Sequence, residues 1–211
     1  MSKNPLSLTR KAVHELKKAP KVEGVLPVFH ERWSSRSFAS DPVSIADLHR
    51  IFEAARWSAS AYNEQPWRFV VGRADDATHR AIAVSLMGFN QEWAARAPVL
   101  ILAVAQTRFS HNGTDNNYAL YDLGAAVTQL TLQAAALGMT THQMAGFDHQ
   151  KARALLGIPE EFALGAAVAL GYQGEPDVLT NERLHGLETS ARSRKPLSEL
   201  VYTSWGHPAN L

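Results

Sequence analysis

An unbroken apolar run at residues 98–105 constrains the fold of this chain more than any other feature. The run reads PVLILAVA and is followed by polar residues. A helix that spans a membrane needs about 20 apolar residues, so this run is too short to be one. It predicts a buried β-strand instead, because it is short, continuous and rich in valine, leucine and isoleucine.

Strands and helices are both predicted along the rest of the chain. Apolar and β-branched segments predict strands over residues 67–71, 139–144 and 163–172. Apolar residues at helical spacing predict helices over residues 44–57, 77–87, 117–137 and 148–156. Ser44 with Asp47 resembles a capping box, and Gly138 follows the longest helix as a C-terminal cap. The small residues at 124–126 of that helix would let a second helix approach closely, as in a central packing helix or a dimer interface.

The two ends of the chain carry weaker signals. Residues 173–211 show little regular pattern and are too long for a simple loop, so they predict an arm that wraps another surface, such as a partner subunit. No linker divides the 211 residues. The chain therefore predicts one domain over residues 1–211, with an N-terminal extension at 1–28 and an extended C-terminal arm at 173–211.

Composition narrows the classes of function. The formal net charge of +1 gives no field strong enough to imply a nucleic-acid partner. The absence of cysteine excludes disulfides, thiolate-bound metals and thiol nucleophiles, so redox chemistry would need a bound cofactor. No secretory signal is visible, and Glu15 with the dominance of lysine argues against an organelle-targeting peptide. We therefore expect a cytoplasmic protein with no membrane partner.

Arg32, Ser34 and Arg36 form the first candidate site. Two guanidinium groups and a hydroxyl can bind the oxygens of a phosphate. On a helix the two arginines would share a face, and on an irregular turn Ser34 would add its hydroxyl between them. A solvated basic turn is the plainer interpretation. The basic cluster at 192–195 (RSRK) would complete a phosphate site if it folds back against Arg32, and is otherwise a surface charge run.

Amide side chains mark a second candidate site. Asn63 and Gln65 stand in a loop directly before a predicted strand, where they could hydrogen-bond a flat polar ring. An ordinary turn, in which Asn63 closes an Asx-turn, is the alternative. Asn90 has the same two interpretations. The segment 143–147 (QMAGF) could direct backbone amides into a pocket or form only a tight strand-to-helix turn.

Several common enzyme templates are missing from the sequence. There is no G-x-x-x-x-G-K-[ST], no G-x-G-x-x-G, no G-x-S-x-G and no H-E-x-x-H. The nine histidines are scattered, and His142 and His149 have no third ligand at metal spacing. No metal site and no catalytic acid or base are predicted.

Five segments in order resemble the nitroreductase family of flavin-dependent oxidoreductases. Residues 32–38 (RWSSRSF) resemble its R-x-S-x-R-x-[FY] signature, and residues 58–67 (SASAYNEQPW) resemble its [AS]-P-S-S-x-N-x-Q-P-W loop. Residues 144–148 (MAGFD), 171–175 (GYQGE) and 192–197 (RSRKPL) resemble three later blocks. Each block alone is weak, but five in register are specific.

The resemblance implies a fold and a cofactor. The fold would be α+β, with a mixed, mainly antiparallel sheet flanked by helices and a C-terminal arm that wraps the partner of an FMN-binding homodimer. Arg32, Arg192 and Arg194 would hold the FMN phosphate, and Ser34 and Arg36 would lie along the ribityl and pyrimidine side.

The resemblance also implies residues around the flavin ring. Ser60 and Asn63 would reach the flavin of the other subunit, Asn90 would meet its polar edge, and the amide of Ala145 would approach N5. The full set of implied cofactor-binding residues is Arg32, Trp33, Ser34, Arg36, Ser60, Asn63, Gln65, Asn90, Met144, Ala145, Gly146, Arg192 and Arg194.

The implied activity is a two-step oxidoreduction. NADH or NADPH would deliver hydride to FMN N5, and a small electron acceptor such as a nitroaromatic or quinone would then take it. The alternatives are a flavin-binding protein for storage or sensing without turnover, and a different flavin reaction such as flavin breakdown or dehalogenation. Ala59 and Trp93 depart from the family pattern, which leaves the redox potential and the acceptor pocket open.

Overall fold

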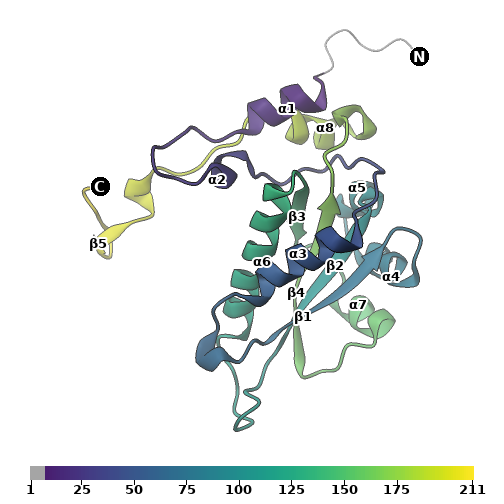
Figure 1. Ribbon diagram of the computed structural model, residues 1–211, viewed down its shortest axis with the longest axis vertical. Helices are drawn as coiled ribbons and strands as arrows, with labels where there is room; N and C mark the ends of the chain where they lie inside the picture. The colour runs from purple at the N-terminus through teal and green to yellow at the C-terminus, as the bar shows by residue number, and fades with distance from the viewer. Residues whose placement is uncertain (1–7) are drawn as a thin grey trace.

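The computed structural model describes residues 8–211, which form a main four-stranded antiparallel sheet with helices on both faces (Figure 1) and a small separate hairpin. Residues 1–7, the start of the predicted N-terminal extension, lie outside the described residues. The helices are α1 (Arg10–Lys17), α2 (Pro27–Glu31), α3 (Ile45–Arg56), α4 (Ala77–Ser85), α5 (Asn90–Trp93), α6 (Ala119–Ala136), α7 (His149–Leu156) and α8 (Glu182–Thr189). The strands are β1 (Trp67–Arg73), β2 (Val99–Gln106), β3 (Thr140–Met144), β4 (Phe162–Gly171), β5 (Tyr202–Ser204) and β6 (His207–Pro208). Short 3₁₀ helices lie at Ala61–Asn63, Ala94–Arg96, Pro176–Val178 and Leu197–Glu199.

The main sheet has the strand order β1-β2-β4-β3. All three of its ladders are antiparallel, and helices pack against it, which confirms the predicted α+β class. The sequence predicted a mixed, mainly antiparallel sheet, and the observed sheet is antiparallel throughout. β5 and β6 form a separate two-stranded hairpin in the C-terminal arm.

The apolar run at 98–105 is the buried strand that its composition predicts. In β2 every residue from Val99 to Ala105 is buried. Leu100, Leu102 and Val104 pack into a core with residues of α4, α5 and α7. Alternate residues of the same strand pack into a second core with α3 and α6. Because both faces of β2 are covered, the strand needs no polar side chains along it.

The predicted helix ends are also present. The Ser44 hydroxyl accepts a hydrogen bond from the backbone N–H of Asp47 at 3.0 Å, which starts α3. Gly138 follows α6 with φ +76°, a left-handed conformation that glycine adopts without a steric penalty. α6 packs against α3 and the sheet through Ala126, which is fully buried, while nothing lies within 4 Å of a Cβ added at Gly124. One side of α6 is therefore packed and the Gly124 side is open.

The C-terminal arm holds more regular structure than the sequence predicted. The expectation of few regular elements after residue 172 is wrong, because α8 lies within the arm. The side chain of Asn181 caps α8 by accepting from the N–H groups of Arg183 and Leu184. Leu184 and Glu188 are buried, and α8 lies beside α1 (Figure 1). Burial against distant segments, rather than helical periodicity, stabilises this helix.

Candidate functional site

The segment Arg32–Phe38 is not helical, and the burial of its side chains alternates from Arg32 to Ser37. Trp33, Ser35 and Ser37 are buried, whereas Arg32, Ser34 and Arg36 are not. Side chains alternate between two faces of an extended chain, so the two arginines and Ser34 share one face. The helical arrangement considered for Arg32 and Arg36 is wrong, and Ser34 lies on the accessible side of the segment together with them.

Glu188 of α8 holds this segment in place. Its Oε1 atom accepts hydrogen bonds from the hydroxyls of Ser35 (2.6 Å) and Ser37 (2.7 Å) and from the N–H of Ser37 (3.2 Å). Its Oε2 atom accepts from the N–H of Arg36 at 2.9 Å. The Glu188 side chain is fully buried, so these bonds satisfy a carboxylate that has no access to water. Glu188 was not among the predicted site residues, because its partners lie more than 150 positions away in the sequence.

The C-terminal basic cluster folds back against Arg32, as the phosphate-site hypothesis requires. The Arg192 guanidinium donates hydrogen bonds to the carbonyl oxygens of Arg32 and His30, both at 2.6 Å. Its Nε atom is buried and has no hydrogen-bond partner within residues 8–211. An orphaned charged donor is costly in a folded protein, so Arg192 Nε is suited to an anionic ligand.

The two basic clusters surround a cavity of about 240 Å³, hereafter the basic cavity. In the part of the chain that the structure describes, none of its arginines forms an ion pair with a carboxylate. Burial lowers the pKa of Arg32, Arg36 and Arg192, and neighbouring arginines lower the pKa of Arg32 and Arg192 further. An anion in the cavity would relieve this repulsion. The cavity is lined by Lys17, Arg32, Trp33, Ser34, Arg36, His142, Arg192 and Arg194.

His142 lies at the inner wall of the basic cavity. Its Nδ1 atom lies 3.0 Å from the carbonyl oxygen of Ser35, so Nδ1 carries the proton and Nε2 is an acceptor in the neutral ring. Burial, followed by the charges of Arg36 and Arg32, lowers the pKa of His142 to about 4. The ring also packs against Trp93, with 4.7 Å between centroids. The ring is therefore neutral at pH 7.

A second part of the site lies at the end of β3. Gly146 O accepts hydrogen bonds from Asn90 Nδ2 (3.1 Å) and from the N–H of Met87 (3.0 Å). A Cβ at Gly146 would lie 2.9 Å from Asn90 Nδ2, so a side chain there would displace the Asn90 amide. Ala145 lies just beyond the last paired residue of β3, Met144. The side chain of Met144 is buried in the core, so only its backbone can meet a ligand.

The two parts are spaced along β3. His142 lines the basic cavity, and Ala145 is three positions further along the chain. At about 3.3 Å per residue these positions are roughly 10 Å apart. A ligand with an anionic group at one end and a planar ring at the other could therefore contact both parts.

The loop that carries Ser60, Asn63 and Gln65 is tightly shaped. Gln65 N–H donates to the Ser60 hydroxyl at 3.0 Å, so Asn63 does not close the Asx-turn that was the alternative. Tyr62, Asn63 and Gln65 have φ of +52°, +54° and +53°, an uncommon conformation for residues other than glycine. The side-chain amide of Asn63 is exposed and makes no hydrogen bond within the described residues.

This loop lies far from the basic cavity of its own chain. The carboxylate of Asp122, near the start of α6, accepts from Ala61 N–H at 3.0 Å and pins the loop there. At the other end of α6, Ala135 lines a small cavity together with Arg32. Asp122 and Ala135 are thirteen positions apart, roughly 20 Å along a helix. The structure therefore brings together the basic cavity and the β3 end, but not Ser60, Asn63 and Gln65.

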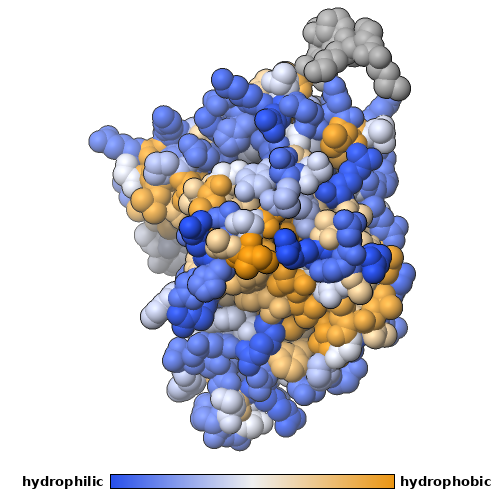
Figure 2. Space-filling view, turned by 45° about the vertical axis from the view of Figure 1, so that its right-hand side comes forward, coloured by the Kyte–Doolittle hydropathy of each residue, from blue (hydrophilic) through white to orange (hydrophobic). Residues whose placement is uncertain are grey.

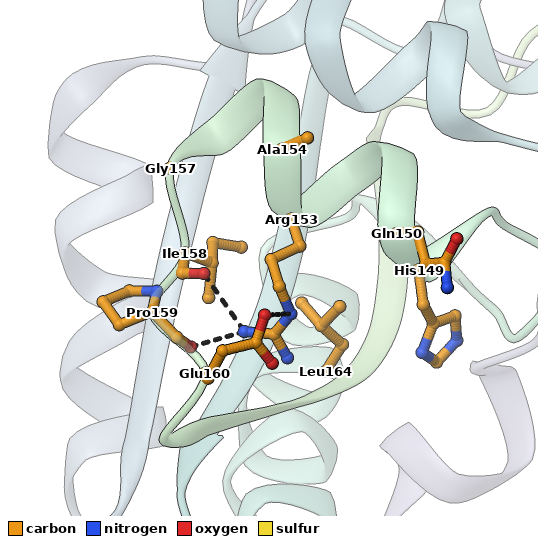
Figure 3. Close-up of a pocket in the computed structure, with 9 residues that line it drawn as sticks. All are labelled: His149, Gln150, Arg153, Ala154, Gly157, Ile158, Pro159, Glu160 and Leu164. Atoms are coloured by element: carbon orange, nitrogen blue, oxygen red, sulfur yellow. Dashed lines mark hydrogen bonds and ion pairs between the residues drawn. The ribbon is translucent and has the colours of Figure 1, made fainter.

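A larger cavity, of about 660 Å³, lies beside α7 (Figure 3). Arg153 points into it and donates to the carbonyl oxygens of Ile158, Pro159 and Phe162, and it also pairs with Glu160. Because this guanidinium already has partners, it has little left to offer an anion. None of the predicted site residues lines this cavity.

Metal binding and membrane insertion can also be assessed within residues 8–211 from the side chains and helices present there. No cluster of three or more histidine, aspartate or glutamate side chains that could hold a metal ion is present there. Nor does any helix within those residues combine the length and apolarity needed to cross a bilayer.

Comparison with known proteins identifies the family. The model of the Nitroreductase family matches residues 30–88 and 73–172. A protein of Thermus thermophilus named NADH dehydrogenase is 33% identical over 191 residues, which cover 73% of this chain and 92% of that protein. The chain belongs to the nitroreductase family, which confirms the resemblance seen in the sequence.

Solved structures agree with this assignment. A crystal structure described as an oxidoreductase containing FMN is 32% identical, with a TM-score of 0.82, and covers 92% of this chain and 97% of its own. A protein of Desulfovibrio desulfuricans, solved in complex with FMN, is 27% identical with a TM-score of 0.67. The match covers 87% of this chain and 98% of that protein.

Proposed function

We propose that this chain is an FMN-dependent oxidoreductase that takes hydride from NADH or NADPH and passes it to a small acceptor such as a nitroaromatic or quinone. The observation that carries the proposal is the basic cavity, whose arginines lack ion-pair partners within residues 8–211 and which lies about 10 Å along β3 from Ala145. The FMN-containing structural relatives support the same cofactor.

The residues of the basic cavity fit a phosphate. Arg32, Arg192 and Arg194 would bind the FMN phosphate, and the orphaned Nε of Arg192 gives it one unused donor. Ser34 and Arg36 share the accessible face of the same segment and would follow the ribityl chain towards the pyrimidine. A cation there would stabilise negative charge on the reduced ring. Trp33 would form part of the cavity wall.

The flavin ring would lie beyond the end of β3. The backbone of Met144, Ala145 and Gly146 would face it, and the Ala145 amide would approach N5. Asn90 is already held against Gly146, so its position at the polar edge of the ring would be fixed before the cofactor binds.

We further propose that each active site forms between two copies of the chain. The loop of Ser60, Asn63 and Gln65 is tied to Asp122 of α6, and Ala135, which lines a cavity with Arg32, lies roughly 20 Å further along that helix. These three residues would therefore serve the flavin of the partner. Figure 2 shows apolar residues gathered in a band across one face, bordered by hydrophilic ones, as is common for a surface that contacts another protein. Trp205, in the hairpin of the C-terminal arm, is 93% exposed, which suits an arm that wraps the partner.

The chemistry would be divided between cofactor and protein. Bound FMN supplies an acceptor and donor of hydride at N5. The chain's own residues bind the phosphate, orient the ring and place positive charge beside it, and none of them has to act as an acid or base.

Steady-state kinetics test the proposal. Initial rates are measured with NADH or NADPH and a quinone or nitroaromatic acceptor, using the FMN-loaded full chain. Turnover with parallel double-reciprocal lines would support the two-step reaction. Tight FMN binding without turnover would instead indicate storage or sensing, and an altered flavin in the product mixture would indicate a flavin-consuming reaction.

A further inference from the structure

The N-terminal helix α1 lies outside the residues that the family model matches, yet it reaches the basic cavity. The match begins at residue 30, whereas α1 covers Arg10–Lys17. α1 lies beside α8 (Figure 1) and is tied to the residues after β4. The N–H of Arg10 donates to Glu175 at 2.8 Å, and the Gln173 side chain donates to Arg10 O at 3.1 Å. These contacts fix the position of the start of α1.

Lys17, the last residue of α1, is buried in the wall of the basic cavity. Its exposed fraction is 6%, which is rare for a lysine. Its Nζ atom donates to the carbonyl oxygen of Leu187 at 2.7 Å and lies 5.1 Å from the ring centroid of Trp33. Burial lowers the pKa of Lys17, and the charges of Arg36 and Arg192 lower it further, while Glu188 opposes them.

A purely structural role explains only part of this arrangement. Leu187 is in the last turn of α8, where a lysine can bind a free carbonyl and offset the helix dipole. One carbonyl uses one of the three protons of an ammonium group. The remaining charge is buried beside Arg32, Arg36, Arg192 and Arg194, and Glu188 is the one acidic group of residues 8–211 that opposes it. A buried cation in such surroundings needs an anion to offset its desolvation.

We infer that Lys17 is a further cationic ligand for the FMN phosphate, which makes α1 part of the cofactor site. This inference rests on the proposed function. Arginines of the segment Arg32–Arg36 and of the C-terminal arm would bind the phosphate on one side. Lys17 would bind it on the other side of the cavity, next to Trp33. The cavity then discriminates FMN from riboflavin, which has the same ring and ribityl chain but no phosphate.

The experiment compares the affinities of the FMN-free full chain for FMN and for riboflavin. Lys17→Met keeps an apolar stem and removes the charge, and Lys17→Arg keeps a cation. Lys18→Met is the matched control, because Lys18 is the next residue, carries the same charge and pairs with Glu15 at 2.7 Å away from the cavity. The wild-type chain is assayed first, and absence of FMN binding or of reduction by NADH and NADPH would reject the proposed function itself.

We expect Lys17→Met to weaken FMN binding roughly 10- to 100-fold, as for loss of a charged hydrogen bond, and to leave riboflavin binding unchanged. Lys17→Arg should stay within a few-fold of wild type, and Lys18→Met should match it. An equal loss for FMN and riboflavin would overturn the inference, because it would show that Lys17 only supports the fold. Unchanged FMN affinity in Lys17→Met would overturn it too.

A measurement on the wild-type chain covers the case in which Lys17→Met does not fold. Inorganic phosphate is titrated into the ¹⁵N-labelled, FMN-free chain, and the side-chain Nζ signal of Lys17 is followed, with Lys17→Arg used for assignment. A saturable shift that FMN reproduces is expected. A Lys17 signal that neither ligand moves would contradict the inference.

Discussion

Replacing Glu188 by glutamine tests how the basic cavity is positioned. Glutamine has the shape of glutamate but only one acceptor oxygen. If that oxygen takes the Oε1 position, the NH₂ group faces the N–H of Arg36. If it takes the Oε2 position, the NH₂ group faces the hydroxyls of Ser35 and Ser37. These hydroxyls can accept from it while the Ser35 hydroxyl donates to Ser37 O and the Ser37 hydroxyl donates to Gly174 O. The N–H of Ser37 then loses its acceptor.

Either orientation buries one backbone N–H without an acceptor. The lost bond is to a charged group, which is worth about 1.5–3 kcal/mol. We therefore expect Glu188→Gln to lower the free energy of unfolding by about that amount. We also expect FMN binding to weaken roughly tenfold, since the segment that carries Ser34 and Arg36 is no longer held in one position.

The assay is urea unfolding of the FMN-free full chain together with FMN titration. Glu182→Gln is the control, because Glu182 lies on the same helix but is exposed in its first turn. Removing that charge should cost less than about 1 kcal/mol and leave FMN affinity unchanged. A Glu188→Gln chain with wild-type stability and wild-type FMN affinity would refute the reasoning.

Three further predictions concern other parts of the site. Arg194→Ala should weaken FMN binding roughly 10- to 100-fold and spare riboflavin, and equal losses in the two titrations would argue against a phosphate contact. Asp122→Ala removes the acceptor for Ala61 N–H and loosens the loop that would serve the partner's flavin, so kcat/KM should fall roughly tenfold; a normal kcat/KM would show that the loop keeps its shape unaided. Burial lowers the pKa of His142 to about 4, below its value near 6.5 in an unfolded chain. The unfolded chain therefore binds the proton more tightly than the folded chain. The free energy of unfolding is then unaffected above about pH 6.5 and falls, by an amount of the order of 3 kcal/mol, as the pH falls to 4. Urea unfolding at pH 7 and 4.5 should show a smaller pH effect in His142→Gln than in wild type, and equal effects would contradict the assigned pKa.

The elements that the sequence predicted well carry their signals locally. Ser44 and Asp148 cap the helices that follow them, and the hydroxyl or carboxylate is within three residues of the N–H that it binds. β2 was predictable because both of its faces are apolar. α8 has the cap residue Asn181 but also Gly186 in its interior, and its buried residues find their partners far away in the chain.

The candidate site also contains residues that the sequence predicts and residues that it does not. The residue types of Arg32, Ser34 and Arg36 were enough to predict a candidate anion site. Their shared face could be seen only in the structure, where it results from side chains that alternate along a non-helical segment. Glu188 could not be assigned from sequence, since its partner Ser35 is 153 positions away. Lys17 was missed for the same reason: its position in the cavity depends on where α1 packs.

The most direct test of the central claim is an anaerobic titration of the FMN-loaded full chain with NADH and with NADPH, followed by visible absorbance. We predict that at least one of the two nicotinamides bleaches the yellow colour completely and that a quinone or nitroaromatic added afterwards restores it. A protein that binds FMN tightly but keeps its colour with both nicotinamides would contradict the proposed oxidoreductase.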